Sequence, residues 1–183
     1  MNDTHNQPLV QRAMCTRNRE GRVWTHILLL IGALALVVML LMHVLVQMRR
    51  TAGCADNLKS IFRALELYEM ERGVLPTLAY FPDHPMEDSD SLRVVLEPYG
   101  LAAHRCVCPQ ARDVQRNEGL TYIWNASLNG QRIPKGADRT WMLVDMNALT
   151  GDVPAPHMGR YNALMSDGTV ERISDPLKEL PGL

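Results

Sequence analysis

The longest uninterrupted pattern in the chain is an apolar run near its N-terminus. Apart from His43, no polar side chain occurs in the twenty residues between Ile27 and Val46. At about 1.5 Å of rise per residue, twenty helical residues match a hydrocarbon core of about 30 Å. Trp24 stands at one edge of the run, where aromatic side chains are common at a membrane interface. The pattern predicts a transmembrane helix over residues 24–48.

A cleaved secretory signal peptide is the main alternative for an apolar run at this position. Its apolar region spans about 7–15 residues and ends in a small-residue cleavage site, whereas this run is longer and is followed by Met48-Arg49-Arg50. Positive residues are equally numerous on the two sides: Arg12, Arg17, Arg19 and Arg22 before the run, and Arg49, Arg50, Lys59 and Arg63 after it. Because such residues favour the cytoplasmic side, this tie leaves the orientation open.

Beyond the run, apolar residues recur with the spacing of one helical face. These residues are Leu58, Ile61, Phe62, Leu65 and Tyr68, with charged residues between them. Gly73 and then Pro76 are typical of a helix end, so we expect the helix to stop near Arg72. The pattern favours one long helix that continues from the apolar run. The alternative is a break near Thr51-Ala52-Gly53, where helix preference is weak.

The C-terminal part alternates short apolar segments with turn residues. A short helix is expected over 91–99 with Ser91 as its cap. Strands are expected at 120–128 (with Tyr122, Trp124 and Ala126 on one side), 141–145, 161–165 and 169–173. Asp167-Gly168 suits a two-residue type I′ turn between the last two, and residues after Pro176 are expected to be irregular. The predicted fold is α+β, a long helix packed on a small antiparallel sheet of three or four strands.

Composition adds limits to this picture. The 183 residues suffice for one compact domain plus a membrane segment. A net charge of −1 gives no general attraction to nucleic acid, and the few aromatic residues, 5% of the chain, are too scattered to form a base-stacking platform. No nucleic-acid partner is expected.

Two motifs and a middle section carry a family resemblance. The early motif is Cys54-x-x-Asn57-Leu58-Lys59-x-Ile61, followed by Ala64-Leu65, Tyr68, Gly73 and Pro76. The middle section consists of Cys108-Pro109, Thr121-Tyr122 and Asn125. The late motif is His157, then nine residues, then Asp167-Gly168. In this order they resemble type IV pilin-like proteins, a superfamily that includes the pseudopilins of type II secretion. The resemblance is strongest to the prepilin-type variety with an H-X9-DG motif, and it covers about residues 27–173.

The resemblance implies a location and a role. It implies a single-pass protein of a bacterial inner membrane, with a cytoplasmic leader (1–23), a transmembrane helix (24–48), a stem helix (49–73) and a periplasmic pilin-like domain (74–183). The implied partners are the lipid bilayer and other pilin-like subunits, which pack through the N-terminal helix. The implied function is a structural or assembly component of a type II secretion or type IV pilus-like system, with no cofactor and no enzymatic activity.

The N-terminal processing region departs from the family pattern. Relatives have Gly, the site of leader cleavage, followed by Phe-Thr-Leu-x-Glu. Here Gly21-Arg22 is the candidate cleavage site, with His26 at the glutamate position; if Trp24-Thr25 is aligned on Phe-Thr instead, Val23 takes the place of Gly and Leu28 that of Glu. We therefore expect most molecules to retain the leader. We also expect a minor or initiating component, or an unassembled relative, rather than the main repeating subunit.

Three cysteines lie on the implied periplasmic side. A disulfide from Cys54 to either Cys106 or Cys108 would tie the stem helix to the domain, and the alternative is reduced, buried cysteines. No metal site is expected. Cys106-x-Cys108 with His104 lacks the paired ligand spacing of zinc sites, and the aspartates considered for calcium, Asp145, Asp152 and Asp167, form no D-x-D-x-D-G loop.

His157 and Asp167 are compatible with a catalytic base and its orienting carboxylate. However, no motif supplies a nucleophile. We expect Asp167 to be a turn residue and His157 to cap or bond the backbone of the same hairpin, so no catalytic residue is assigned. Two alternatives stay open: a stand-alone, membrane-anchored periplasmic binding domain, and a membrane-anchored hydrolase that uses His157.

Overall fold

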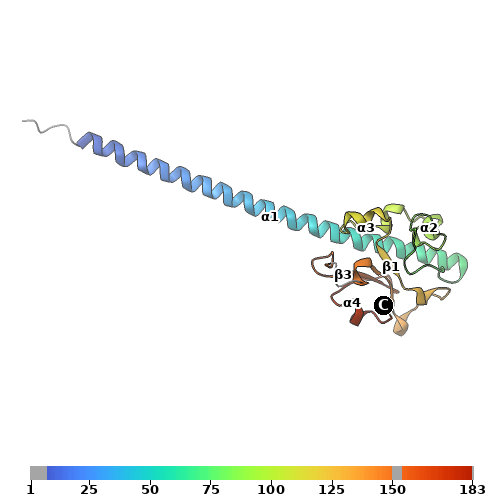
Figure 1. The fold of residues 1–183 in the computed structure, drawn as a ribbon. Coiled ribbons are helices and arrows are strands. Elements are labelled where there is room, and N and C mark those ends of the chain that lie inside the picture. The colour runs from blue at the N-terminus through green and yellow to red at the C-terminus, as the bar shows by residue number, and fades with distance from the viewer. Residues whose placement is uncertain (1–7, 150–153, 183) are drawn as a thin grey trace, which may run out of the picture. The chain divides into compact units, whose positions relative to one another are not determined.

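The structure is a computed structural model that describes the backbone of residues 8–149 and 154–182, and side chains from residue 22 onward. The chain forms two compact units, Met1–Gln47 and Met48–Leu183. Helix α1, Pro8–Arg72, is 65 residues long and contributes to both units (Figure 1). The two units are described in turn.

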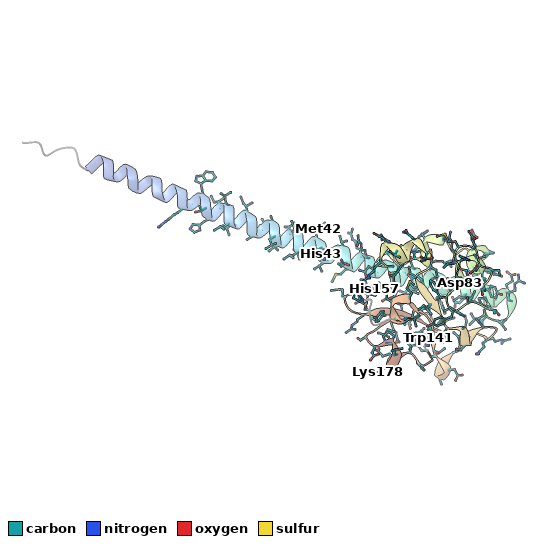
Figure 2. The ribbon with its side chains drawn as sticks, viewed as in Figure 1. Met42, His43, Asp83, Trp141, His157 and Lys178 are labelled. Carbon is teal, nitrogen blue, oxygen red and sulfur yellow. A yellow bond between two sulfur atoms is a disulfide. The ribbon has the colours of Figure 1, made fainter. Side chains whose placement is uncertain are left out.

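In the first unit, the helix carries the apolar run. Among the described residues, one helical segment is long and apolar enough to cross a membrane, and it is the part of α1 from Arg22 to Arg72. Its apolar side chains are exposed, with Leu30 at 70% and Met39 at 69%, and Figure 2 marks Met42 and His43 on this stretch. Such exposure is typical of a segment whose solvent is lipid.

In the second unit, α1 is amphipathic. Leu58, Ile61 and Leu65 are completely buried, whereas Lys59 between them is exposed. The helix passes through residues 51–53 without a break and ends at Arg72, as the sequence predicts. Gly73 follows with a φ of +81°, and its N–H donates to the Glu69 carbonyl at 2.7 Å.

The second half of α1 packs on a four-stranded antiparallel sheet with strand order β1-β2-β3-β4. The strands are β1 (Tyr122–Trp124), β2 (Trp141–Asp145), β3 (Tyr161–Met165) and β4 (Val170–Ile173). Side chains alternate between two apolar clusters, one on each face. Tyr122, Trp124, Leu143 and Leu164 join the α1 cluster, and Ile123, Val144, Ala163 and Ile173 form the other.

Short helices complete the second unit. They are α2 (Leu92–Leu96), α3 (Asp113–Asn117), α4 (Pro176–Glu179) and the 3-10 turns Glu97–Tyr99, Ala103–Cys106, Ala126–Leu128, Gly136–Asp138 and Met146–Leu149. The α+β fold predicted from the sequence is confirmed. A long apolar N-terminal helix packed on a four-stranded antiparallel sheet is a pilin-like architecture.

The first strand is shorter than predicted, because Asn125 ends it. The Asn125 side chain accepts a hydrogen bond from the Ser127 N–H at 3.2 Å, which starts a 3-10 turn in place of further strand. Ala126 is consequently exposed and does not share a face with Tyr122 and Trp124.

Two further expectations are corrected near the C-terminus. Residues 177–179 belong to α4 and are not irregular, whereas residues 180–182 are irregular as expected. The Pro181 carbonyl accepts a hydrogen bond from Trp141 Nε1 at 2.9 Å. The β3–β4 loop is not a I′ turn. Gly168 has a φ of +79° and donates to the Met165 carbonyl at 2.9 Å, but Asp167 has no positive φ. This is a three-residue loop that ends in a left-handed glycine.

Ser91 precedes α2, as predicted, but its side chain does not cap the helix. The Ser91 hydroxyl instead donates to the Pro85 carbonyl at 2.6 Å. The bond secures the loop that leads into the helix.

Candidate functional site

The strongest concentration of buried polar chemistry lies where α1 meets the sheet. We call it the junction cluster: Cys54, Cys108, Gln110, Asp145 and His157. Its members come from α1, from the loop before α3, from β2 and from the loop before β3.

A disulfide joins Cys54 of α1 to Cys108, closing a sequence separation of 54 residues. Of the two pairings that the sequence left open, the structure contains this one, and Cys106 is a buried free thiol. Burial raises the pKa of Cys106 to about 12, so the thiol is protonated at neutral pH. Thr121 positions the second disulfide partner, because its hydroxyl accepts from the Cys108 N–H at 2.7 Å.

The remainder of the early motif supports the same contact. Asn57 Nδ2 donates to the Val107 carbonyl at 2.8 Å, and Asn57 Oδ1 accepts from Arg105 Nη1 at 3.1 Å. Leu58 enters the apolar core and Lys59 faces solvent. Cys54, Asn57 and Leu58 therefore attach the stem helix to the domain.

His157 lies among side chains, not against the hairpin backbone as the sequence reasoning expected. The imidazole is 0% exposed. Its Nε2 is 3.1 Å from Asp145 Oδ2 and 3.6 Å from Cys108 Sγ, and its Nδ1 hydrogen-bonds Gln110 Oε1. The backbone of His157 pairs with that of Arg160. Sequence separation explains the error, because the three side-chain neighbours Asp145, Gln110 and Cys108 lie 12, 47 and 49 residues before His157.

Asp145 is a carboxylate at the end of an otherwise apolar strand. It lies two residues after Leu143 and therefore faces the α1 side of the sheet. Asp145 Oδ2 also accepts from the Asn162 N–H at 2.6 Å, whereas Oδ1 has no hydrogen-bond partner among the residues described. A cavity of about 10 Å³, lined in part by Cys108 and Asp145, adjoins it.

The sequence analysis did not single out Asp145 as a partner of His157, nor Gln110 at all. A usable signal was present for Asp145, because a charged residue that closes a strand as apolar as Trp-Met-Leu-Val must find a partner when buried. Gln110 carried no such signal, since it lies in a loop that nothing in the pattern assigns to the core.

The late motif also contacts the stem helix. A Cβ built on Gly168 would come within 2.7 Å of Phe62 on α1, so the backbone approaches the ring too closely for any side chain. Asp167 Oδ1 accepts from the Thr169 hydroxyl and N–H, and Oδ2 from Arg139 Nε at 2.6 Å. The hydrogen bond from the Thr169 hydroxyl, with Arg139, lowers the pKa of Asp167 to about 2. Asp167 is thus a turn residue, as expected.

The aspartates considered for calcium do not assemble into one site. Asp145 lies at the C-terminal end of β2. Asp167 follows β3, which is antiparallel to β2, and therefore lies near the N-terminal end of β2. Asp152 lies outside the described residues. His104 is exposed, and the group that brings possible metal-ligand atoms together is instead Cys54, Cys108 and His157, within 4.8 Å of one another.

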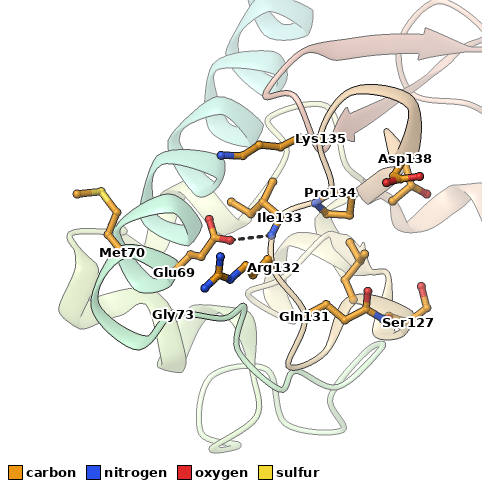
Figure 3. A pocket seen from close by; sticks show the side chains of 12 residues that line it. Glu69, Met70, Gly73, Ser127, Gln131, Arg132, Ile133, Pro134, Lys135 and Asp138 are labelled. Atoms are coloured by element: carbon orange, nitrogen blue, oxygen red, sulfur yellow. Dashed lines mark hydrogen bonds between the residues drawn. The ribbon is translucent and has the colours of Figure 1, made fainter.

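A wide cleft of about 980 Å³ opens beside the end of α1 (Figure 3). One wall carries Glu69 and Met70, and the other is the segment from Ser127 to Thr140, which contributes Arg132 and Lys135. Glu69 Oε1 accepts from the Ile133 N–H at 2.8 Å, which holds this segment against the helix. The cleft thus combines apolar surface with two basic residues, Arg132 and Lys135, and two acidic residues, Glu69 and Asp138.

The candidate leader cleavage site, Gly21-Arg22, lies within α1. A comparison of the chain with protein-family models, with curated proteins and with solved structures finds no match. What the structure itself shows is the pilin-like architecture, a long apolar N-terminal helix on a four-stranded antiparallel sheet, with one candidate membrane-spanning helix.

Proposed function

We propose that this chain is a pilin-like or pseudopilin-like protein of a bacterial inner membrane, a minor structural or assembly component of a type II secretion or type IV pilus-like system. Its N-terminus is cytoplasmic and its C-terminal domain periplasmic. The observation that carries the proposal is the division of α1 into an exposed apolar stretch, residues 27–46, and a stem that is fixed to a sheet.

Both halves of the helix support the proposal. The apolar half offers only van der Waals packing to a neighbour, and Gly32, Ala33 and Ala35 allow close helix approach within a bilayer. The stem half is tied to the domain by Cys54, Asn57 and Phe62. A disulfide there agrees with an oxidising compartment such as the periplasm.

The missing glutamate favours a minor component. In the resembling family that glutamate is thought to neutralise the N-terminal amine of the neighbouring subunit, and an unpaired charge in hydrocarbon costs several kcal/mol. This chain has His26 or Leu28 at that position, depending on the alignment. A subunit that lacks this anion is better suited to a filament tip than to its repeat.

The test is crosslinking in native membranes. A cysteine at Ala35, in a Cys15→Ser background, is expected to give adducts of one or two copies of this chain with a different pilin-like protein. A cysteine at the exposed stem residue Lys59 is the matched control for proximity outside the apolar half. Ladders of many copies of this chain alone would contradict the minor role, and absence of any adduct would contradict assembly.

The cleft beside α1 favours a second candidate, a stand-alone anchored domain that binds a ligand outside the membrane. It would be supported if Arg132→Ala and Lys135→Ala abolished the function in the cell while the adducts of the membrane half persisted. A hydrolase that uses His157 would need an opening to the imidazole, which is completely buried.

A further inference from the structure

We propose that the junction cluster binds one Zn²⁺ when Cys54 and Cys108 are reduced. The ligands are the two cysteine Sγ atoms, His157 Nε2 and Asp145 Oδ2. The stem helix would then be tied to the sheet either by a disulfide or by a metal ion. This site goes beyond the proposed function and does not depend on it.

The spacing of the ligand atoms suits a tetrahedral zinc ion. With Zn–S of about 2.3 Å and Zn–N of about 2.05 Å, sulfur and nitrogen ligands lie about 3.6 Å apart, and Cys108 Sγ is 3.6 Å from His157 Nε2. Nitrogen and oxygen ligands lie about 3.3 Å apart on the same basis, against 3.1 Å between His157 Nε2 and Asp145 Oδ2. On reduction the two sulfur atoms must separate to about 3.8 Å.

The second nitrogen of the imidazole is already held as metal-binding histidines require. His157 Nδ1 bonds Gln110 Oε1, a carbonyl oxygen that can only accept, so Nδ1 carries a proton. Nε2 faces another acceptor, the Asp145 carboxylate. With Nδ1 as the donor, the lone pair of Nε2 can bind Zn²⁺ in the reduced form.

The chemistry of the donors selects the metal. Two thiolates and an imidazole are ligands for zinc rather than for calcium or magnesium, which take oxygen ligands. The ligand residues are almost wholly buried, with Asp145 at 2% exposure, so a bound ion is shielded from water. The atoms that lie within 4.8 Å of one another belong to Cys54, Cys108 and His157, and Asp145 adjoins this group through the 3.1 Å contact of its Oδ2 with His157 Nε2. Cys106, also buried, is not a member of the group.

The two states interconvert by ordinary thiol chemistry. A dithiol reductant transfers two electrons and two protons to the disulfide and leaves as its own disulfide, giving two Cys–SH groups. Zinc binding then releases the two thiol protons to solvent. A newly made chain has reduced cysteines, so zinc can also bind before the disulfide forms.

The experiment uses the full chain in detergent, kept reduced from cell lysis onward or fully oxidised, with metal removed from both samples. Reduced protein is expected to take up one Zn²⁺ per chain in a competition with a chromogenic chelator, and oxidised protein none. Co²⁺ added to the reduced protein should give the visible d–d bands of a tetrahedral site with thiolate charge-transfer absorption.

Variants identify the ligands. Cys108→Ser and His157→Ala should weaken zinc affinity by more than about 100-fold, and Asp145→Asn by about 10-fold. Cys106→Ser and His104→Ala are the matched controls and should bind like the unchanged protein. The proposal is overturned if reduced protein binds no zinc, if oxidised protein binds equally, or if Cys106→Ser abolishes the Co²⁺ spectrum. Because the Co²⁺ spectrum is recorded on unmodified protein, a misfolded variant does not remove the test.

Discussion

Gly168 meets two separate constraints at one position. Its φ of +79° lies in the left-handed region, and the Phe62 ring occupies the space that a Cβ would need. Gly130 shares the first constraint, with a φ of +68°, but has open space around its Cβ position. Comparing the two positions separates backbone strain from packing.

Gly168→Ala should therefore lower the free energy of unfolding by more than Gly130→Ala does. Backbone strain alone accounts for about 1 kcal/mol at either site, and the contact with Phe62 adds to it only at Gly168. Gly168→Val should cost at least as much as Gly168→Ala. Denaturant unfolding followed by tryptophan fluorescence gives these values, and equal losses at the two glycines would contradict the Phe62 contact.

Asp167 makes stability depend on acid. Its folded pKa of about 2 lies below the ordinary aspartate value of 3.8, so its stabilisation is fully present above about pH 4 and is lost as the pH falls toward 2. The unfolding free energy of Asp167→Asn should thus fall less steeply between pH 4 and pH 2. Water moderates the difference, because the side chain is 43% exposed. Asp90→Asn, at an exposed aspartate, is the matched control for the loss of one surface charge.

At the scale of single residues, the sequence predicted the local conformation of a residue better than the residues that it contacts. Asp-Gly predicts a turn from local backbone preferences, and the turn is present at residues 166–168. The partners of His157 and Gly168 lie on segments remote in sequence, and no local pattern encodes such contacts. For Asp145, at the end of β2, the sequence did indicate that a partner was needed, because a buried charge must be paired.

Among the elements, the apolar periodicity of the sequence predicted those helices and strands that bury one face. The C-terminal end of α1 and the bounds of β2 and β3 agree with the apolar patterns, because each of these elements buries a face, whereas α1 begins at Pro8, ahead of the apolar run. β1 was predicted too long, because one asparagine side chain ends it. The helix α4 was not predicted, and the segment around it is held by the hydrogen bond from Trp141 to the Pro181 carbonyl. Single hydrogen bonds of this kind produce no periodic pattern in the sequence.

The attachment of α1 to the sheet depends strongly on the disulfide. The paired variant Cys54→Ala/Cys108→Ala opens a loop with a sequence separation of 54, which should cost about 4 kcal/mol on the chain-entropy account. Cys106→Ala removes one buried sulfur without opening a loop and should cost about 1 kcal/mol. Thermal and denaturant unfolding in chelator-treated buffer measures both. A paired variant no less stable than Cys106→Ala would show that the cross-link contributes little.

For the molecule as a whole, the open question is which side of the membrane holds the domain. We expect a reporter that is active only in the periplasm to be active when fused after Gly182, and inactive when placed ahead of Met1. The reason is the pilin-like resemblance together with a disulfide in the domain, since the charges beside the helix are tied. Activity of a cytoplasm-only reporter after Gly182 would overturn the orientation.

Cleavage of the leader, residues 1–21, would also change the molecule as a whole. Cleavage after Gly21 would leave Arg22 as the first residue, a cation where relatives place Phe at the head of a buried helix. An arginine there can still extend to the membrane interface, so insertion itself is not prevented. What the chain lacks is the residue pattern of the processing site, with His26 at the position of the glutamate.

Most molecules should therefore retain the leader when the chain is expressed in a host with a prepilin peptidase. Intact-mass spectrometry of the membrane-extracted protein should show a species that includes residues 1–21. The double variant Arg22→Phe/His26→Glu restores the family pattern at both positions, and it should be cleaved and N-methylated in the same host. That variant shows that the peptidase reaches the chain, so retention in the unchanged protein reflects its own sequence. A main species that starts at Arg22 and carries an added methyl group would contradict the prediction and would make assembly as an ordinary subunit the better account.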